Sequence, residues 1–212
     1  TYDAAERHHI RHLWPADIAA FRRHLKRLDA DTRQARFGSP VNEQFLEAYA
    51  DTAHRLGTLI YGAYYGSEIR ASAELRSLEI VGEAMAEAAF TVEKSYQDKG
   101  LGSLLMNRII TAAQNRSISQ LHMICLRDND RMQHLAGKFG ARLKIKSGEV
   151  TGRIDPTYPT PVSVFEEALD GQAHGERLER VPQRVGRRDA GPLVGELDAQ
   201  VLVEVALDEA RE

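Results

Sequence analysis

The chain has 212 residues, of which 42% are hydrophobic, so it is long enough to bury a core and to form one main domain with an appendage. Its 28 lysines and arginines against 31 aspartates and glutamates give a net charge of −3, which argues against nucleic acid as the main partner. No apolar run approaches the roughly 20 residues of a membrane helix, and the N-terminus has no hydrophobic signal segment, so we expect a cytoplasmic protein without a membrane partner.

The N-terminal quarter is predicted to form the start of a strand followed by two helices. Residues 10–14 are typical of a strand start, and Pro15 and Asp17 then open a helix. Apolar residues at helical spacing support this first helix, namely Ile18, Phe21, Leu25 and Leu28. A second helix is expected over residues 41–56, so two helices precede the sheet.

From residue 58 the pattern changes to that of strands. Residues 58–66 and 69–80 are β-branched or aromatic runs separated by Gly66, as expected for a hairpin. A third, mostly apolar run covers residues 84–92. These runs predict antiparallel strands that lead into a central strand.

The following segment alternates helices and strands. Residues 103–116 form an amphipathic pattern, 120–126 a short buried-strand pattern, and 128–141 a helix stopped by Gly140. Residues 142–150 are expected to form one further strand. A strand, helix and strand in succession predict a βαβ crossover, so part of the sheet should be parallel and the fold class is α/β (α+β).

The C-terminal part differs in character. Residues 162–169 are predicted to form a short helix, whereas 171–190 are poor in apolar residues and typical of a linker or arm. Residues 199–207 alternate as a strand would but also suit a helix, and a strand there needs a partner in the same protomer or in another. We therefore expect a main domain over residues 1–168 and an extension over 169–212, and a homodimer stays open.

Two glycines, Gly100 and Gly102, lie between the third strand run and the amphipathic helix. The N-terminus of a helix presents free N–H groups and a positive dipole end, which favour phosphate, and glycines let the backbone approach the anion. The spacing does not match a P-loop, and Leu105 occupies the place of the third glycine of a dinucleotide fingerprint. A plain tight turn is the alternative.

Gln97, Gly100 and Gly102 form the pattern Gln-x-x-Gly-x-Gly, which resembles the acyl-CoA-binding loop of the GNAT N-acetyltransferase superfamily. The segment "DNDRMQHLAGKFGARL", with Asn129 near its start and Leu135 within it, is similar to a later helix of that family. The resemblance extends from residue 10 to about residue 150. Within the superfamily, "AEAAFTVEKSYQDKGLGSLLMNRII" and the upstream "DTRQARF" are similar to acetyltransferase domains that modify protein lysines.

The resemblance implies a GNAT-like fold, with a mixed and largely antiparallel sheet flanked by helices and a βαβ unit that binds acyl-CoA. Residues 1–168 would be the acetyltransferase domain. The cosubstrate would be acetyl-CoA, no metal is expected, and the partner would be an amine substrate, either a small molecule or a protein lysine. The implied cofactor-binding residues are Phe90, Val92, Gln97, Lys99, Gly100, Leu101, Gly102, Ser103 and Asn129.

The family carries a Glu on the strand before the loop as general base, which corresponds here to Glu87. Glu87 would share one strand face with Ala89 and Thr91, and apolar neighbours would strengthen it as a base. The alternative is a Glu that points to solvent. Many relatives also carry a Tyr that protonates the leaving thiolate, where this chain has Ala136, so a catalytically weak acyl-CoA-binding sensor or regulatory module is the second functional interpretation.

Two other features could indicate a metal site or a nucleophile, but a simpler interpretation is favoured for each. His8, His9 and His12 lie close together in the sequence, but no carboxylate follows at metal-ligand spacing. Cys125 is the only cysteine and falls within a buried-strand pattern, so we expect a core side chain and no nucleophile.

Overall fold

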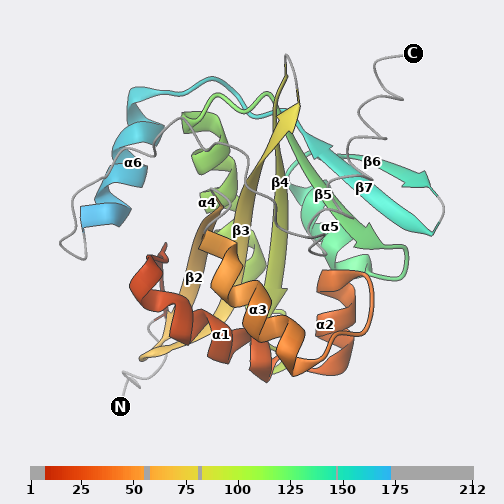
Figure 1. The fold of residues 1–212 in the computed structure, drawn as a ribbon. Coiled ribbons are helices and arrows are strands. Elements are labelled where there is room, and N and C mark those ends of the chain that lie inside the picture. The colour runs from red at the N-terminus through yellow and green to blue at the C-terminus, as the bar shows by residue number, and fades with distance from the viewer. Residues whose placement is uncertain (1–7, 55–57, 81–82, 147, 173–212) are drawn as a thin grey trace.

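The computed structural model describes residues 8–54, 58–80, 83–146 and 148–172 (Figure 1). In this part of the chain a seven-stranded sheet has the order β1-β2-β3-β4-β5-β7-β6. Its strands are β1 (His8–His12), β2 (Leu59–Tyr65), β3 (Glu68–Ile80), β4 (Glu83–Val92), β5 (Gln120–Leu126), β6 (Arg142–Lys146) and β7 (Glu149–Ile154). All neighbouring strands are antiparallel except β4 and β5, which are parallel. The mixed, largely antiparallel sheet is therefore confirmed.

Helices cover both faces of the sheet (Figure 1). They are α1 (Ile18–Arg27), α2 (Ala30–Phe37), α3 (Glu43–Ala53), α4 (Leu101–Asn115), α5 (Asp130–Lys138) and α6 (Pro161–Gln172), with single 3-10 turns η2 (Pro15–Asp17) and η4 (Lys94–Tyr96). The helices α1, α2 and α3 lie on one face, and α4 lies on the other. Helix α4 connects the parallel strands β4 and β5, which confirms the βαβ crossover.

Three helices, and not two, lie between β1 and β2. The backbone of Leu28 is extended, and Asp29 then caps a new helix by accepting a hydrogen bond at Oδ1 from the backbone N–H of Thr32 (3.1 Å). Gly38 ends this helix in the left-handed conformation, with φ of 71°. The prediction missed α2 because the cap at Asp29 follows the preceding helix with no loop between them.

A second difference lies near the end of the sheet. The single strand expected over residues 142–150 is a hairpin of β6 and β7, and Gly148 between them has φ of 90°. Strand β7 continues to Ile154 and lies between β5 and β6. The turn requires a residue in the left-handed conformation, and Gly148 supplies it. The chain therefore turns at this glycine, although the residues on both sides have the pattern of a single strand.

Alanines on the strands make room for α4. Ala73 on β3 and Ala88 on β4 are buried against the apolar side of that helix. The helix contributes Leu105, Met106 and Ile109, which are fully buried. Small side chains on the strands let the helix approach closely, so the start of α4 is held firmly beside the end of β4.

The opposite face of the sheet carries a second core and, beside it, a set of polar side chains. The core packs α1 and α3 on β2 and β3, and it includes Phe21, Leu25, Leu46, Ile60 and Ile69. Next to it, β3 and β4 direct Glu74, Glu87 and Thr91 into the interior, and these three side chains are buried. Buried polar groups need hydrogen-bond partners. This part of the sheet is therefore where we look for a functional site.

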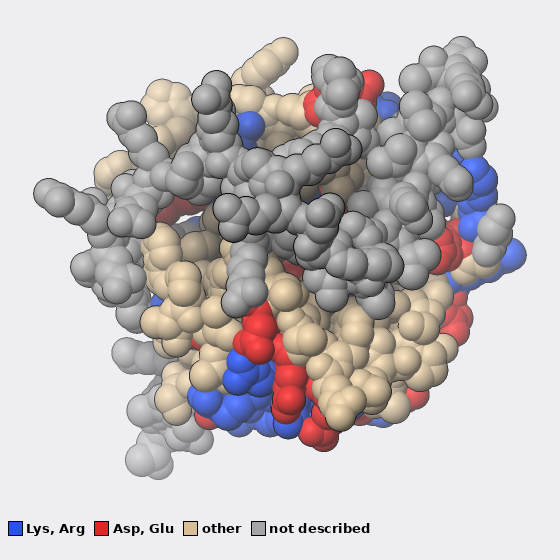
Figure 2. Space-filling view, viewed as in Figure 1, with Lys and Arg blue, Asp and Glu red and all other residues tan. Residues whose placement is uncertain are grey.

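On the outer surface of α1 and α3, basic and acidic side chains alternate (Figure 2). The Lys26 Nζ atom lies 2.9 Å from carboxylate oxygens of both Glu43 and Glu47, and Arg22 pairs with Asp51. Because both signs occur side by side, this surface does not form a basic patch.

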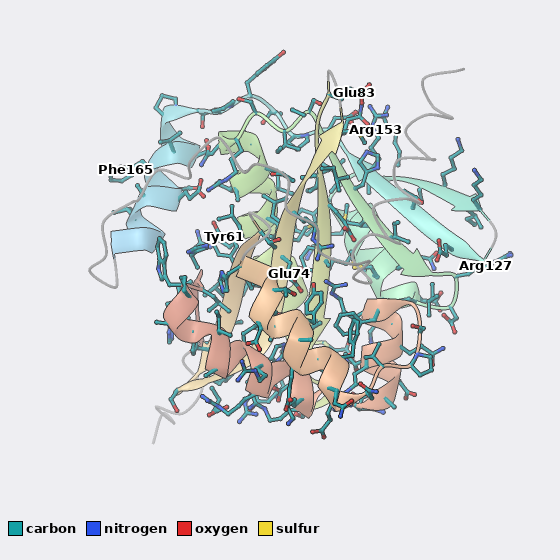
Figure 3. The ribbon with its side chains drawn as sticks, in the orientation of Figure 1. Tyr61, Glu74, Glu83, Arg127, Arg153 and Phe165 are labelled. Carbon is teal, nitrogen blue, oxygen red and sulfur yellow. The ribbon has the colours of Figure 1, made fainter. Side chains whose placement is uncertain are left out.

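Helix α6 confirms the helix predicted over residues 162–169. It packs beside α4 through Asn115, whose Nδ2 atom donates hydrogen bonds to the Ser163 carbonyl oxygen (3.0 Å) and to Glu167 (2.7 Å). Phe165 points away from this contact and is exposed (Figure 3). The predicted linker and C-terminal strand lie almost entirely outside the described residues, so the two-part domain division and the homodimer stay predictions.

Within the described ranges, none of the helices has the length and apolar character that crossing a membrane requires.

Candidate active site

The parallel strands β4 and β5 pair over a short stretch and then separate. The described pairing runs from Met85 opposite Gln120 to Glu87 opposite His122. Strand β4 stays paired with β3 as far as Val92 on its other side. Beyond Glu87 the β5 side of β4 therefore offers backbone groups that a ligand can bind.

A cleft of about 730 Å³ begins at this opening. Its walls are the end of β4, the glycine loop, the first turn of α4, and parts of α2 and α5. This volume suits a cofactor-sized ligand. Every residue that the sequence predicts to bind the cofactor lines the cleft except Lys99, whose Nζ atom lies 4.9 Å above the centre of the Tyr96 ring.

The two glycines of the loop serve different purposes. Gly100 has φ of 81°, and a Cβ atom there would meet no atom within 4 Å, so its conformation and not its surroundings favours glycine. At Gly102 a Cβ atom would lie 3.3 Å from Cδ2 of Leu135, because α5 packs closely on the start of α4. Gly102 therefore makes room for α5, and its part in the approach of an anion stays a prediction.

Side chains fix the loop to the elements around it. Gln97 donates a hydrogen bond from Nε2 to the carbonyl oxygen of Val92 (3.1 Å), which ties the loop to the end of β4. Lys138 on α5 donates one from Nζ to Oγ of Ser103 (3.0 Å). A positive charge therefore lies beside the first turn of α4, where free N–H groups already favour an anion.

A buried network of polar groups on the α1 side of the sheet contacts the end of β4. The Thr91 hydroxyl lies 2.6 Å from Oγ of Ser72 and 2.8 Å from Nε2 of His24, and His24 Nδ1 lies 3.0 Å from a carboxylate oxygen of Glu93. Burial lowers the pKa of His24, so its ring is favoured in the neutral form. This network positions the strand segment that lines the cleft.

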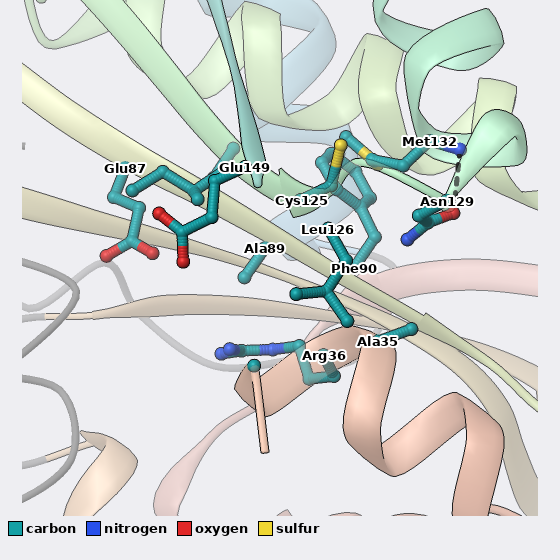
Figure 4. Close-up of a pocket in the computed structure, with 13 residues that line it drawn as sticks. Ala35, Arg36, Glu87, Ala89, Phe90, Cys125, Leu126, Asn129, Met132 and Glu149 are labelled. Atoms are coloured by element: carbon teal, nitrogen blue, oxygen red, sulfur yellow. Dashed lines mark hydrogen bonds between the residues drawn. The ribbon is translucent and has the colours of Figure 1, made fainter. Parts of the chain in front are cut away.

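A second, narrow pocket of about 60 Å³ continues from the cleft toward the paired part of β4 and β5. Glu87, Glu149 and Arg36 direct their charged groups toward it (Figure 4). The volume accommodates a few water-sized groups. Glu87 is only 7% exposed, so the alternative that it points to solvent is wrong.

The surroundings of Glu87 are charged as well as apolar. Its Oε2 atom lies 3.9 Å from the guanidinium of Arg76, which occupies the facing position on β3. Both side chains are largely buried. The sequence predicted apolar neighbours from β4 alone, but the cross-strand neighbour is an arginine.

A cluster of charged groups lies next to Glu87 and joins α2 and α3 to the sheet. The Tyr49 hydroxyl donates a hydrogen bond to Glu74 Oε2 (2.5 Å) and accepts one from Arg36 (2.6 Å) and one from Arg76 (3.3 Å). Burial raises the pKa of Tyr49, so the phenol keeps its proton and donates it to the carboxylate. Glu74 lies at the centre of this cluster, over the middle of the sheet (Figure 3).

Asn129 caps a helix and also lies where the predicted contact with a ligand is possible. Its Oδ1 atom accepts a hydrogen bond from the backbone N–H of Met132 (3.1 Å), which caps α5 (Figure 4). The same side chain lines both the cleft and the narrow pocket. The cap fixes the amide, so its remaining polar atoms are well placed for a ligand.

Ala136 and Cys125 are core residues. Ala136 is buried and faces β7, where a Cβ atom on Gly152 would lie 3.6 Å from its own Cβ. It lines neither pocket, so this position holds no acid for a leaving thiolate. Cys125 borders the narrow pocket, and burial raises the pKa of its thiol to about 11, so it is protonated at neutral pH.

The three N-terminal histidines do not converge. His8 stacks on Tyr65, with ring centres 5.6 Å apart, and His9 stacks on Tyr64 at 5.1 Å. Adjacent strand residues point to opposite faces, so these two rings cannot share a ligand. The described residues contain no group of three or more His, Cys, Asp or Glu side chains that could hold a metal.

Sequence reasoning missed two residues that the structure brings to the narrow pocket, Arg36 on α2 and Glu149 at the start of β7. Arg36 belongs to "DTRQARF", a segment that we had singled out only for its resemblance. Glu149 lies in the hairpin that was predicted as one strand. Recognising Asp29 as a cap and Gly148 as a turn would have predicted α2 and the hairpin, but not where they lie relative to Glu87.

A sheet opened between parallel strands, with a helix N-terminus at the open end and a buried carboxylate at the closed end, is the arrangement of acyl-CoA-dependent acyltransferases. A family model described as the acetyltransferase (GNAT) family matches residues 22–141. The chain belongs to this family.

Similar proteins agree with this assignment. Acetyltransferase Pat of Mycolicibacterium smegmatis is 39% identical over 57 residues, which are 27% of this chain and 17% of that protein's length. The GNAT domain of S. lividans PAT superposes with a TM-score of 0.59 at 20% identity, covering 69% of this chain and 89% of that one. The acetyltransferase yncA of Salmonella typhimurium, solved with acetyl-CoA, has a TM-score of 0.57 at 17% identity and covers 73% and 97%. At these identities the two structures show a shared fold.

Proposed function

We propose that the chain is an acetyl-CoA-dependent N-acetyltransferase that transfers an acetyl group to a primary amine. The position of Glu87 carries this proposal. This buried carboxylate lies where β4 and β5 separate, in a narrow pocket that joins the cofactor-sized cleft. A carboxylate there can remove a proton from an amine that enters from the side of α2 and α3.

The chain's own groups suit the binding of acetyl-CoA, which supplies the thioester carbon that the amine attacks. Backbone amides of residues 99–103 would hold the diphosphate, because free N–H groups and the helix dipole favour anions and Lys138 adds a positive charge. Amides of β4 near Phe90 and Val92 would orient the pantetheine arm and donate to the thioester carbonyl. Asn129 would contact the same arm.

Glu87 would accept the proton as the amine nitrogen bonds to the acetyl carbon, directly or through one water. The carbon–sulfur bond then breaks, and the thiolate leaves and takes up a proton. Ala136 cannot supply that proton, so we assign this role to water in the cleft. Arg76, whose guanidinium lies 3.9 Å from Oε2 of Glu87, would help to orient this carboxylate.

Lysine side chains of proteins are the acceptors we favour over small amines. This choice rests on the similarity of residues 86–110 to lysine-modifying domains and on the match to acetyltransferase Pat. Incubation with acetyl-CoA and lysine-containing peptides, followed by mass spectrometry, tests the choice against small amines assayed in parallel.

The first experiment is a calorimetric titration of the protein with acetyl-CoA. Gly100→Glu places a strained, negatively charged side chain at the diphosphate position and should abolish binding. Gly100→Asn is the matched control, because Asn tolerates a positive φ and carries no charge. Binding that persists in Gly100→Glu would refute the position of the diphosphate.

A second function, an acyl-CoA-binding sensor, is favoured by one observation. Ala136 packs against β7 and leaves the thiolate without a side-chain acid. A sensor would bind acetyl-CoA but release no free CoA in the presence of amines. Release of thiol in a colorimetric assay would decide for the enzyme.

A further inference from the structure

Glu149, at the start of β7, brings a second carboxylate to the narrow pocket of Glu87. The pairing of the strands places both residues on one face of the sheet. Glu87 lies beside His122 on β5, and Glu149 lies beside Leu126, four residues further along β5. Because alternate strand residues point to the same face, Glu87 and Glu149 both point toward the face that α2 covers. Figure 4 shows their carboxylates directed into the pocket, with the guanidinium of Arg36 opposite.

Glu149 is accessible to a ligand. Its side chain is half-buried, and Gly38, which lines the same pocket, is exposed. Neither residue lines the larger cleft. The narrow pocket is therefore open to solvent on a side that the cleft does not include. An acceptor that enters on this side can contact Glu149 and reach the buried Glu87 while acetyl-CoA occupies the cleft.

The carboxylate of Glu149 is available for binding. No hydrogen bond or ion pair joins it to a described residue, and this includes Lys146, which lies opposite Glu149 in the pairing of β6 with β7. Its charge acts inside the pocket, since burial, Asp128 and Glu149 raise the pKa of the Cys125 thiol, which borders the pocket. A ligand there can therefore bind this carboxylate without displacing a partner.

The charge of the pocket favours a cation. Arg36 lies 3.1 Å from a carboxylate oxygen of Glu74, and Glu87 lies 3.9 Å from the guanidinium of Arg76. Glu149 adds a negative charge that neither of these pairs balances, so an anionic ligand would be repelled. A primary amine such as a lysine side chain has a pKa of about 10.4 in water and therefore arrives as an ammonium ion.

We propose that Glu149 binds the protonated amine of the acceptor and holds it beside Glu87. This inference rests on the proposed function and deepens it, because it names cationic amines as the class of acceptor. Glu149 holds the ammonium group, and Glu87 then removes a proton, since only the neutral amine can attack the thioester. Glu149 itself takes up no proton and is a specificity-determining residue.

Carboxylates without partners are common on protein surfaces, so the position of Glu149 in the pocket is what indicates a ligand. Glu166 on α6 provides the matched control. It is exposed and lines neither the cleft nor the narrow pocket. A loss of charge at Glu166 alters the surface but not the proposed binding site.

The experiment measures initial rates at saturating acetyl-CoA for the parent protein, Glu149→Gln, Glu149→Asp and Glu166→Gln. Gln keeps the shape of the side chain and removes its charge, whereas Asp keeps the charge. The acceptors are a lysine-containing peptide and butylamine, whose ammonium group is its only charge. Each is assayed at about 0.05 and 0.5 M NaCl, because salt screens charge–charge attraction. Calorimetry gives the affinity for acetyl-CoA in parallel.

We expect Glu149→Gln to raise the KM of both amines about tenfold at low salt, with kcat within about threefold of the parent. Glu149→Asp should stay within about threefold of the parent KM, and Glu166→Gln should equal the parent. High salt should raise the KM of the parent but change that of Glu149→Gln much less. The affinity for acetyl-CoA should be the same in all four proteins.

Several results would overturn the proposal. An unchanged KM in Glu149→Gln would show that the carboxylate does not bind the amine. Equal effects of Asp and Gln would show that the charge is not what matters, and weaker acetyl-CoA binding in Glu149→Gln would indicate an altered cleft. A butylamine KM of the parent that is independent of salt would also overturn it, and this test needs no variant.

Failure of the proposed function gives a different result. A parent protein that binds acetyl-CoA but releases no CoA with either amine refutes the proposed function, and the inference with it. A parent protein that acetylates the amines, together with an unaltered Glu149→Gln, refutes the inference alone.

Discussion

Replacing Tyr49 with Phe removes a single oxygen atom from the centre of the charged cluster beside Glu87. Tyr49 itself is partly exposed, but its hydroxyl joins Glu74, which is 3% exposed, to Arg36, which is 7% exposed. In the variant Glu74 loses a donor at 2.5 Å and Arg36 loses an acceptor at 2.6 Å. Phe fills almost the same volume, so the cost comes from hydrogen bonds and not from a cavity.

The expected loss is about 2–3 kcal/mol in the free energy of unfolding, since hydrogen bonds to charged groups contribute roughly 1.5–3 kcal/mol each and the ion pair between Arg36 and Glu74 remains. Urea denaturation followed by circular dichroism measures this loss. Tyr158→Phe is the control. Tyr158 is 89% exposed, so loss of its hydroxyl should leave the free energy of unfolding unchanged. A loss below about 0.5 kcal/mol for Tyr49→Phe would refute the view that the hydroxyl holds the buried charges together.

Three other changes follow from the site and its surroundings. Glu87→Gln should lower kcat for acetyl transfer about 100-fold or more without weakening acetyl-CoA binding, and unchanged turnover would remove Glu87 as the base. Gly102→Val should push Leu135 aside and lower the free energy of unfolding by about 1–3 kcal/mol, measured in urea, whereas an unchanged value would show that α5 can shift freely. Burial lowers the pKa of His12 to about 4, so protons bind the unfolded chain more tightly and stability is lost as the pH falls from 6.5 toward 4. His12→Phe should reduce this loss by about 2–3 kcal/mol in unfolding experiments across that range, and identical pH profiles would contradict the assignment.

Most of the residues that line the cleft could be predicted from the sequence because their signals are local. The pattern from Gln97 to Gly102 and the amphipathic helix after it lie in one continuous segment, and the structure brings them to one cleft. Glu87 lies a few residues upstream on the strand that enters this loop. A short segment with strong turn and helix signals needs little tertiary information.

The surroundings of Glu87 could not be predicted because they depend on distant residues. Arg76 faces Glu87 only through the pairing of β3 with β4, and Arg36 reaches the pocket only because α2 lies against β4. Nothing in the spacing of these arginines distinguishes them from surface residues. Cross-strand register and the place of a short helix are set by packing of the whole chain.

The two apolar cores lie on opposite faces of the sheet, and the site lies at the boundary between them. Helices α4 and α5 line the site from one face of the sheet, and α2 lines it from the other. Substitutions in one core therefore leave the opposite face largely undisturbed, because the sheet separates them. Such a division would allow one half of the site to diverge during evolution while the other half is retained.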